Sequence, residues 1–163
     1  MAKNILNNGG KDIDNAFPAY EDLPDIELYM DQVISYTSKV IEPFNCGHDE
    51  KLITPSIINN YVKNGVIGRP VNKKYSKEHL AALIGLCILK QTFSLSDLAE
   101  FTKKYMPKDQ VEYVYNAFVK YQKEIIKRVE DDLEETKKER LALKLALLAN
   151  TYKLAAERVM EEL

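Results

Sequence analysis

The sequence predicts an all-α, or at least predominantly α-helical, protein in which a helical domain over residues 23–106 precedes a C-terminal helical pair over residues 107–163. The first observation behind this prediction is that apolar residues recur at steps of three and four along most of the chain, which is the periodicity of amphipathic helices. The second is that glycine and proline, the residues that most often interrupt helices, are absent from Lys108 to the C-terminus.

Composition sets the outer bounds of the fold. With 163 residues, 45% of them apolar and 29% charged, the chain is long enough for one core with a helical appendage. It contains no apolar run of the ~20 residues that a membrane span requires. The opening MAKNILNNGGKDID lacks the apolar centre of a signal peptide, so we expect a cytoplasmic protein. Two cysteines far apart predict no disulfide framework.

The N-terminal part divides into a flexible segment and a first helix. Residues 1–22 are polar and show no apolar period, so we expect a flexible segment, although Phe17-Pro18-Ala19-Tyr20 could dock on the domain. Asp25 is the expected N-cap of a helix over residues 26–41 that ends by Pro43. Its apolar stripe comprises Ile26, Tyr29, Met30, Val33, Tyr36, Val40 and Ile41.

A second helix is expected over residues 55–64. Thr54 is a suitable N-cap, Pro55 suits the first helical position, and Asn64-Gly65 tolerates the left-handed backbone that commonly ends a helix. The periodicity gives this helix two faces. Ile57, Ile58, Tyr61 and Val62 form the apolar face, and Ser56, Asn59, Asn60 and Lys63 form the polar one.

A basic loop leads from this helix to the next two. It runs through Gly68-Arg69-Pro70 and Asn72-Lys73-Lys74-Tyr75, and we expect it to be exposed. Ser76 caps a helix over residues 77–91 with a broad apolar face, in which Cys87 is a small buried residue and His79 lies at or near the surface. Ser94 caps a further helix, with Asp97 in the place of the capping-box glutamate.

These segments resemble two known families. The order Y..NG.I, a short loop with Pro and Lys, YS.EHL and FSLSDL is similar to the winged helix-turn-helix of the mercury-resistance-regulator (MerR) family. Over more of its length the chain resembles a bacterial family known only as domain of unknown function 1836. Members of that family share the segments LPDIELYMDQVISY, INNYVKNG and KKYSKEHL.

The MerR resemblance implies a DNA-binding role. In that family the helix corresponding to 55–64 enters the major groove, the following loop is a wing, and C-terminal helices form a dimer. The resemblance implies that one face of this helix reads bases, where asparagine is suited to contact adenine. It also implies that the wing contacts phosphates or the minor groove. The expected reading face is Ser56, Asn59, Asn60 and Lys63, and the expected wing residues are Arg69, Lys73, Lys74 and Tyr75. Asn59 stands where the MerR pattern usually has arginine, and the loop is shorter.

The charge distribution agrees with a DNA-binding role even though the net charge is -2. Residues 51–77 contain six basic residues and no acidic ones, whereas residues 1–50 contain three basic and ten acidic. A localised positive patch is the electrostatic footprint of a nucleic-acid binder. The alternative is an ordinary solvated surface, on which Asn59 and Asn60 only contact water.

The C-terminal region predicts two helices. Val114, Phe118, Tyr121 and Ile125 form one apolar stripe, whose phase does not continue into the second, so we expect a bend within residues 130–140. The second stripe comprises Leu141, Leu145, Leu148, Tyr152, Ala155 and Val159. This helix needs cover on more than one side, either within its own chain or at a dimer interface formed by Leu141, Leu145, Leu148 and Tyr152.

No motif for catalysis, a metal or a cofactor is apparent. The chain has no phosphate-binding glycine loop and no nucleophile motif, so we expect no enzyme and no cofactor. Cys46-Gly47-His48 has metal-ligand residue types but only one of the two ligand pairs that tetrahedral sites need, so a polar loop is expected. The prediction is a dimeric DNA-binding regulator, and its alternative is a helical protein–protein adaptor. Whether a small-molecule effector binds is left open.

Overall fold

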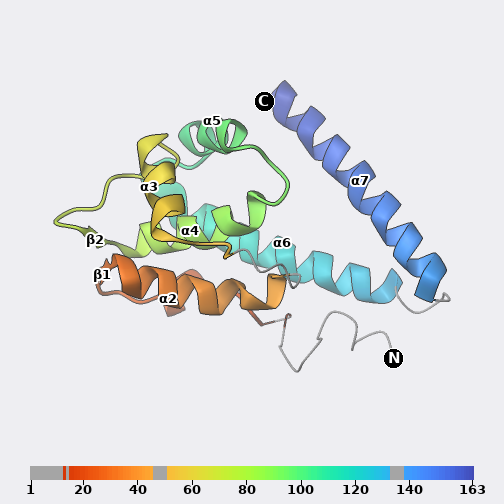
Figure 1. Cartoon of the computed structure of the whole chain (residues 1–163), viewed down its shortest axis with the longest axis horizontal. Coiled ribbons are helices and arrows are strands. Elements are labelled where there is room, and N and C mark those ends of the chain that lie inside the picture. Colours follow the sequence, from red (N-terminus) through yellow and green to blue (C-terminus); the bar gives the residue numbers. More distant parts are fainter. Residues whose placement is uncertain (1–12, 14, 46–50, 133–137) are drawn as a thin grey trace.

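The computed structural model describes residues 13, 15–45, 51–132 and 138–163. Within these residues it is mostly helical, with six α-helices and a two-stranded antiparallel sheet (Figure 1). No helix in the described part of the chain combines the length and apolar character needed to cross a membrane. The elements are β1 (Leu28–Tyr29), α2 (Met30–Ile41), α3 (Pro55–Lys63), β2 (Lys74–Tyr75), α4 (Lys77–Leu89), α5 (Leu95–Tyr105), α6 (Val111–Asp132) and α7 (Lys138–Glu162).

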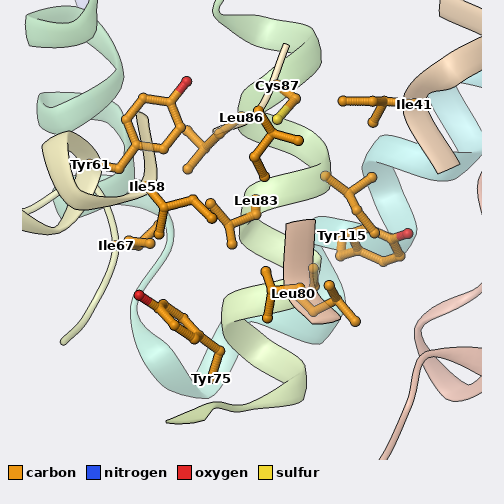
Figure 2. Close-up of a cluster of buried hydrophobic side chains, with 14 of the residues drawn as sticks. Ile41, Ile58, Tyr61, Ile67, Tyr75, Leu80, Leu83, Leu86, Cys87 and Tyr115 are labelled. Atoms are coloured by element: carbon orange, nitrogen blue, oxygen red, sulfur yellow. The ribbon is translucent and has the colours of Figure 1, made fainter. Parts of the chain in front are cut away.

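Helix α4 is the centre of the core, because α2 and α6 both pack against it (Figure 1). Figure 2 shows its leucines lying between Ile58 of α3 on one side and Tyr115 of α6 on the other. The side chains that α4 buries almost completely come from more than one face of the helix: Leu80, Ala81, Leu83, Ile84, Leu86 and Cys87. The core includes residues of α6, so it crosses the domain boundary expected at residue 106.

Residues Phe17 to Tyr20 dock on the helical domain, a possibility that the sequence left open. The Phe17 ring is 4% exposed, stacks on Phe44 at 4.5 Å between ring centroids, and meets Phe118 edge-on at 5.0 Å. The hydroxyl of Tyr115 donates a hydrogen bond to the Pro18 carbonyl at 3.1 Å. Aromatic burial therefore fixes this end of the segment on α6, while residues 1–12 and 14 lie outside the described part.

The expected start of the first helix is wrong. Leu28 and Tyr29 form strand β1, and α2 begins only at Met30. The reason is tertiary, because the backbone of these two residues pairs antiparallel with Tyr75 and Lys74. Asp25 is therefore no N-cap. Its carboxylate instead contacts the Lys77 ammonium at 2.8 Å.

The basic loop folds into a tight β-hairpin. Val71 and Lys74 exchange two backbone hydrogen bonds, of 2.8 and 3.1 Å, around the two-residue turn Asn72-Lys73. Both turn residues have positive φ, 49° and 62°, which is the backbone of a type I′ hairpin turn. β1 pairs with the second arm of this hairpin at Lys74 and Tyr75, so the loop is held to the start of α2.

The expected caps of α3 and α5 are confirmed. The Thr54 hydroxyl accepts a hydrogen bond from the Ile57 N–H at 3.2 Å, and Gly65 after α3 has a φ of +70°. The Ser94 hydroxyl accepts from the Asp97 N–H, and the Asp97 carboxylate accepts from the Ser94 N–H, each at 3.2 Å. These local signals lie in the sequence itself, which is why the starts of both helices could be predicted from it.

The apolar stripe of α6 was predicted in the wrong phase. Tyr121 and Ile125 are 59% and 55% exposed, and the buried positions of this helix are Val111, Tyr115, Val119 and Ile126. The phase of the helix is that of Tyr115, whose ring faces the core while its hydroxyl donates a hydrogen bond to the Pro18 carbonyl. The two expected helices correspond to α6 and α7. The bend expected within residues 130–140 involves residues 133–137, which lie outside the described part.

His79 joins the start of α4 to the loop before the hairpin. Its Nδ1 accepts the Ser76 backbone N–H at 3.1 Å, and its ring meets Tyr75 edge-on at 5.6 Å. The Ser76 hydroxyl donates to the Glu78 carboxylate, which lowers the pKa of Glu78. Burial lowers the pKa of His79, and the opposing effect of the Gly68 backbone does not offset this. The imidazole is therefore neutral near pH 7 and can accept the helix-capping hydrogen bond.

The hairpin turn yields a test at Lys73. A side chain in left-handed backbone costs free energy that glycine avoids, so Lys73→Gly should raise the free energy of unfolding by about 0.5–1 kcal/mol. Urea denaturation followed by circular dichroism measures this change. Lys73→Ala is the control, because it removes the same charge and keeps the strained backbone. Equal stability of the two variants would contradict the turn conformation.

The half-buried imidazole of His79 yields a test of pH dependence. The folded-state pKa of His79 lies below its ordinary value of 6.5, so the unfolded chain takes up this proton first as pH falls. The contribution of His79 to stability is thus present above pH 6.5 and is lost as pH falls toward the folded-state pKa.

Replacing the imidazole removes this linkage. His79→Asn keeps an oxygen able to accept the Ser76 N–H, so its free energy of unfolding should fall less steeply than that of wild type between about pH 7 and 5. Urea titrations across that range measure both slopes. His79→Ala should be less stable at every pH because it also loses the cap. Identical slopes for wild type and His79→Asn would refute the assignment.

Candidate nucleic-acid interface

Helix α3 presents one continuous polar face to solvent. Ile58 and Tyr61 are 0% and 2% exposed and hold the opposite face of the helix in the core (Figure 2). The polar residues predicted from the sequence follow the helical spacing i, i+3, i+4 and i+7, which places them side by side. All four are exposed: Ser56, Asn59, Asn60 and Lys63. The structure therefore brings the predicted reading residues together on one accessible surface.

The two asparagines of this face are in different states. The Asn64 amide group donates hydrogen bonds of 2.8 Å to both the side-chain oxygen and the backbone carbonyl of Asn60. A base that used the side-chain oxygen of Asn60 would have to share it with Asn64. In the described structure the exposed Asn59 side chain makes no such hydrogen bond, so its amide is the freer group for a bidentate contact with an adenine edge.

The hairpin carries cations beside α3. Lys73 occupies the exposed tip of the turn, and Arg69 is exposed on the loop leading into it. The Lys74 ammonium lies over the Tyr29 ring, 5.5 Å from the centroid, so its side chain is partly ordered by β1. These three positions can reach an anionic surface.

Tyr75, in contrast, was expected among the wing contacts but is buried. Its side chain is 3% exposed and packs against His79, with its pKa raised by burial. It therefore supports the hairpin from within and does not face a ligand.

Not every cation of the basic segment is available. The Lys77 side chain is only 14% exposed, contacts the Asp25 carboxylate, and donates to the Glu21 carbonyl at 3.3 Å. Its ammonium also lies 5.1 Å from the Tyr20 ring centroid. This lysine fixes the N-terminal segment on α4 and leaves little charge for a partner.

Two titratable side chains of the core, those of Cys87 and Tyr61, are shielded from water. Burial raises the pKa of the Cys87 thiol to about 12 and that of the Tyr61 hydroxyl to about 12, so both are protonated and unreactive at neutral pH. No set of three or more metal-ligating residues gathers among the described residues. Cys46 and His48, whose residue types are those of metal ligands, lie outside them.

Helix α7 has two apolar sides. Leu141 is buried within the chain, Leu145 and Leu148 are half-buried, and Tyr152 is exposed. Because successive residues of a helix turn by about 100°, Leu143 and Leu147 point to the opposite side of the axis. Leu143 and Leu147 are 64% and 61% exposed. The most exposed leucines of α7 therefore lie on the side opposite to the stripe of Leu141, Leu145 and Leu148 that the sequence predicted as an interface.

Two further lysines, which no pattern in the sequence pointed to, lie near Lys63 and Arg69 in the fold. Lys103 of α5 and Lys108 in the turn before α6 line the same groove as Lys63 and Arg69. Nothing in the local pattern relates these lysines to α3, because about 40 residues separate them from it. Only the packing of α5 and α6 around α4 brings the four together.

Comparison with known proteins places the chain in a family but assigns no activity. No curated protein and no solved structure matches it. A family model does match, over residues 18–118, and that range contains β1, α2, α3, the hairpin, α4, α5 and the first turns of α6. The match covers more than half of the chain, which therefore belongs to the family described as Domain of unknown function (DUF1836).

Proposed function

We propose that this protein is a sequence-specific DNA-binding regulator of MerR-like type that acts as a dimer. The observation that carries the proposal is the exposed polar face of α3, with Ser56, Asn59, Asn60 and Lys63 side by side and the cationic hairpin tip next to it in the chain. A helix anchored on its inner face by Ile58 and Tyr61 is a rigid element, as a groove-reading helix must be.

The order of elements supports the same proposal. A helix, a second helix with an exposed polar face, a β-hairpin and a further helix follow one another as α2, α3, the turn at Asn72-Lys73, and α4. In this arrangement α3 reads the major groove, and Arg69, Lys73 and Lys74 hold phosphates of the flanking backbone. The side chains on α3 then provide sequence choice, and the hairpin provides affinity that depends on salt.

Selection from genomic DNA tests the function directly. Purified full-length protein is mixed with fragmented DNA from its own source, washed near physiological salt, and the retained fragments are sequenced. Specific complexes survive such a wash because they are typically at least a thousandfold tighter than non-specific ones. Enrichment of one motif with two-fold symmetry supports the regulator and its dimer, and no enrichment by folded protein overturns both.

The hairpin lysines give a quantitative test. Lys73→Ala combined with Lys74→Ala should weaken binding to all sequences and flatten the dependence of log affinity on log salt by roughly two, because two phosphate contacts are lost. Fluorescence anisotropy between about 50 and 300 mM salt measures the slope.

Two matched variants separate the parts of this prediction. Lys120→Ala with Lys123→Ala removes the same charge from two exposed positions of α6 that do not line the groove at the hairpin, and should leave the slope unchanged. Asn59→Ala should instead relax the choice of base at one position of each half-site with little change in slope. A slope unaltered in the hairpin double variant refutes the wing assignment.

Dimer formation is proposed through α7. Leu143, Leu147 and Leu154 lie on one side of this helix and are 46–64% exposed. A row of uncovered leucines is typical of a surface that another protein covers. A second copy of the chain would cover it symmetrically, and two reading heads would then bind half-sites ~34 Å apart or at a multiple of that spacing.

The interface is tested by placing charges on α7. Leu143→Glu with Leu147→Glu should convert the protein to a monomer in sedimentation and weaken DNA binding, because both carboxylates would be buried at the interface. Ala142→Glu with Ala149→Glu adds the same charge on another exposed face of α7 and should leave a dimer. A wild-type protein that sediments as a monomer at micromolar concentration would contradict the proposal.

A second candidate function rests on the same leucines. In an adaptor, α7 would bind a helix of a different protein and the helix-turn-helix would serve only as scaffold. The net charge of -2 favours this alternative. Such a protein would retain no DNA in the selection experiment, and its monomeric state would be unaffected by the glutamate substitutions.

A further inference from the structure

The structure contains a groove behind the hairpin that borders the reading face at Lys63 and extends beyond it. Its volume is about 860 Å³, which is within the range of pockets that bind small molecules. One wall is formed by the end of α3 and the loop into the hairpin, and the other by the end of α5 and the start of α6. His79 and Ala82 of α4 line it between these walls.

The charges around this groove are mainly positive. Five basic residues line it and two acidic ones, Glu27 and Glu78. The Glu78 carboxylate already accepts the Ser76 hydroxyl. The ion pairs between described residues are those of Lys77, Lys120 and Lys153. None of them involves the five basic side chains of the groove, which are Lys63, Arg69, Lys74, Lys103 and Lys108. Unneutralised cations from separate elements around one concave surface create a potential that attracts an anion.

The remaining lining is apolar. Val62 on one wall and Met106 on the other are half-buried and leave hydrocarbon surface between the cations, with the buried side chains of Ile67 and Val111 beneath them. Such a surface gains free energy by covering an apolar group, which a bare inorganic anion cannot supply. The matching ligand therefore has a charged head and an apolar body.

We propose that this groove binds a small amphipathic anion, namely a carboxylate or phosphate monoester attached to an apolar chain, and that its occupancy weakens DNA binding. The binding site stands on the groove alone, whereas the regulatory effect rests on the proposed DNA-binding function. The link between the two is physical, because Lys63, Arg69 and Lys74 line the groove and also belong to the proposed DNA contact surface. A bound anion neutralises these cations and so reduces the attraction of DNA phosphates.

The binding step is tested on the full chain without DNA. Amide ¹H–¹⁵N spectra are recorded while octyl phosphate is added below its micellar concentration, and parallel titrations use octanoate, 1-octanol, octylamine and inorganic phosphate. Octyl phosphate and octanoate should shift the amides of Gly68, Ala82 and Lys103. They should bind at least about tenfold more tightly than inorganic phosphate or octanol, because only they have both a charge and an apolar chain.

The titrations also define what overturns the site. Equal binding of octylamine, equal binding of octanol, or shifts confined to α7 would show general adsorption to apolar surface and would refute the groove. Tight binding of inorganic phosphate alone would refute the apolar part of the ligand class.

Two variants test the residues of the groove. Lys103→Gln with Lys108→Gln should weaken octyl phosphate binding by at least about tenfold, since two of five cations are lost. Lys120→Gln with Lys123→Gln is the control of equal charge outside the groove and should bind as wild type. Ala82→Leu narrows the groove by adding a side chain at its floor and should reduce binding of octyl phosphate without altering net charge. Unchanged binding in both groove variants, with native spectra, would overturn the site.

The regulatory step is read separately by anisotropy with labelled DNA. Octyl phosphate should weaken DNA binding of the wild type, and the Lys103→Gln, Lys108→Gln variant should bind DNA within about threefold of wild type but resist this inhibition. If DNA binds but octyl phosphate has no effect, the regulatory effect is refuted and the binding site is retained. If no protein binds DNA under any condition, the proposed function fails, and the spectra alone decide the groove.

Discussion

The constraint on which the whole fold depends is that α4 is apolar on more than one face. A helix with this composition cannot lie on a surface, because its uncovered side would expose hydrocarbon to water. Leu80, Leu83 and Leu86 are therefore enclosed by α2, α3 and α6 together (Figure 2). The positions of α3 and of the hairpin follow from this burial, since the inner face of α3 belongs to the same core as α4.

The short antiparallel sheet of β1 and β2 fixes the hairpin relative to that core. β1 pairs with β2 through Leu28 and Tyr75, and both of these side chains are buried. His79 adds a contact from the first turn of α4 to Ser76 and Tyr75. The exposed tip at Lys73 is therefore attached at its base to two helices, which is how a short hairpin can present cations at a defined place. The groove behind the hairpin exists because the same base keeps it apart from α5 and α6.

The candidate site could be predicted in part because its signals are local. Spacing placed Ser56, Asn59, Asn60 and Lys63 on one face of α3, and the caps at Thr54 and Ser94 marked where their helices begin. Tyr75 was misplaced because residue type alone does not tell an exposed aromatic contact from a buried support. The phase of α6 was misplaced because the hydrogen bond from Tyr115 to Pro18 joins residues 97 positions apart.

The sequence by itself determined the helical class, the caps of α3 and α5, the presence of two C-terminal helices and the concentration of positive charge in residues 51–77, because each depends on neighbours within a few turns of helix. Only the tertiary structure decided that Leu28 and Tyr29 are a strand and that Lys103 and Lys108 join Lys63 and Arg69. It also decided which side of α7 keeps its leucines exposed. These features depend on pairing and packing between distant segments, for which the free energy comes from burial of the shared core and not from any local pattern.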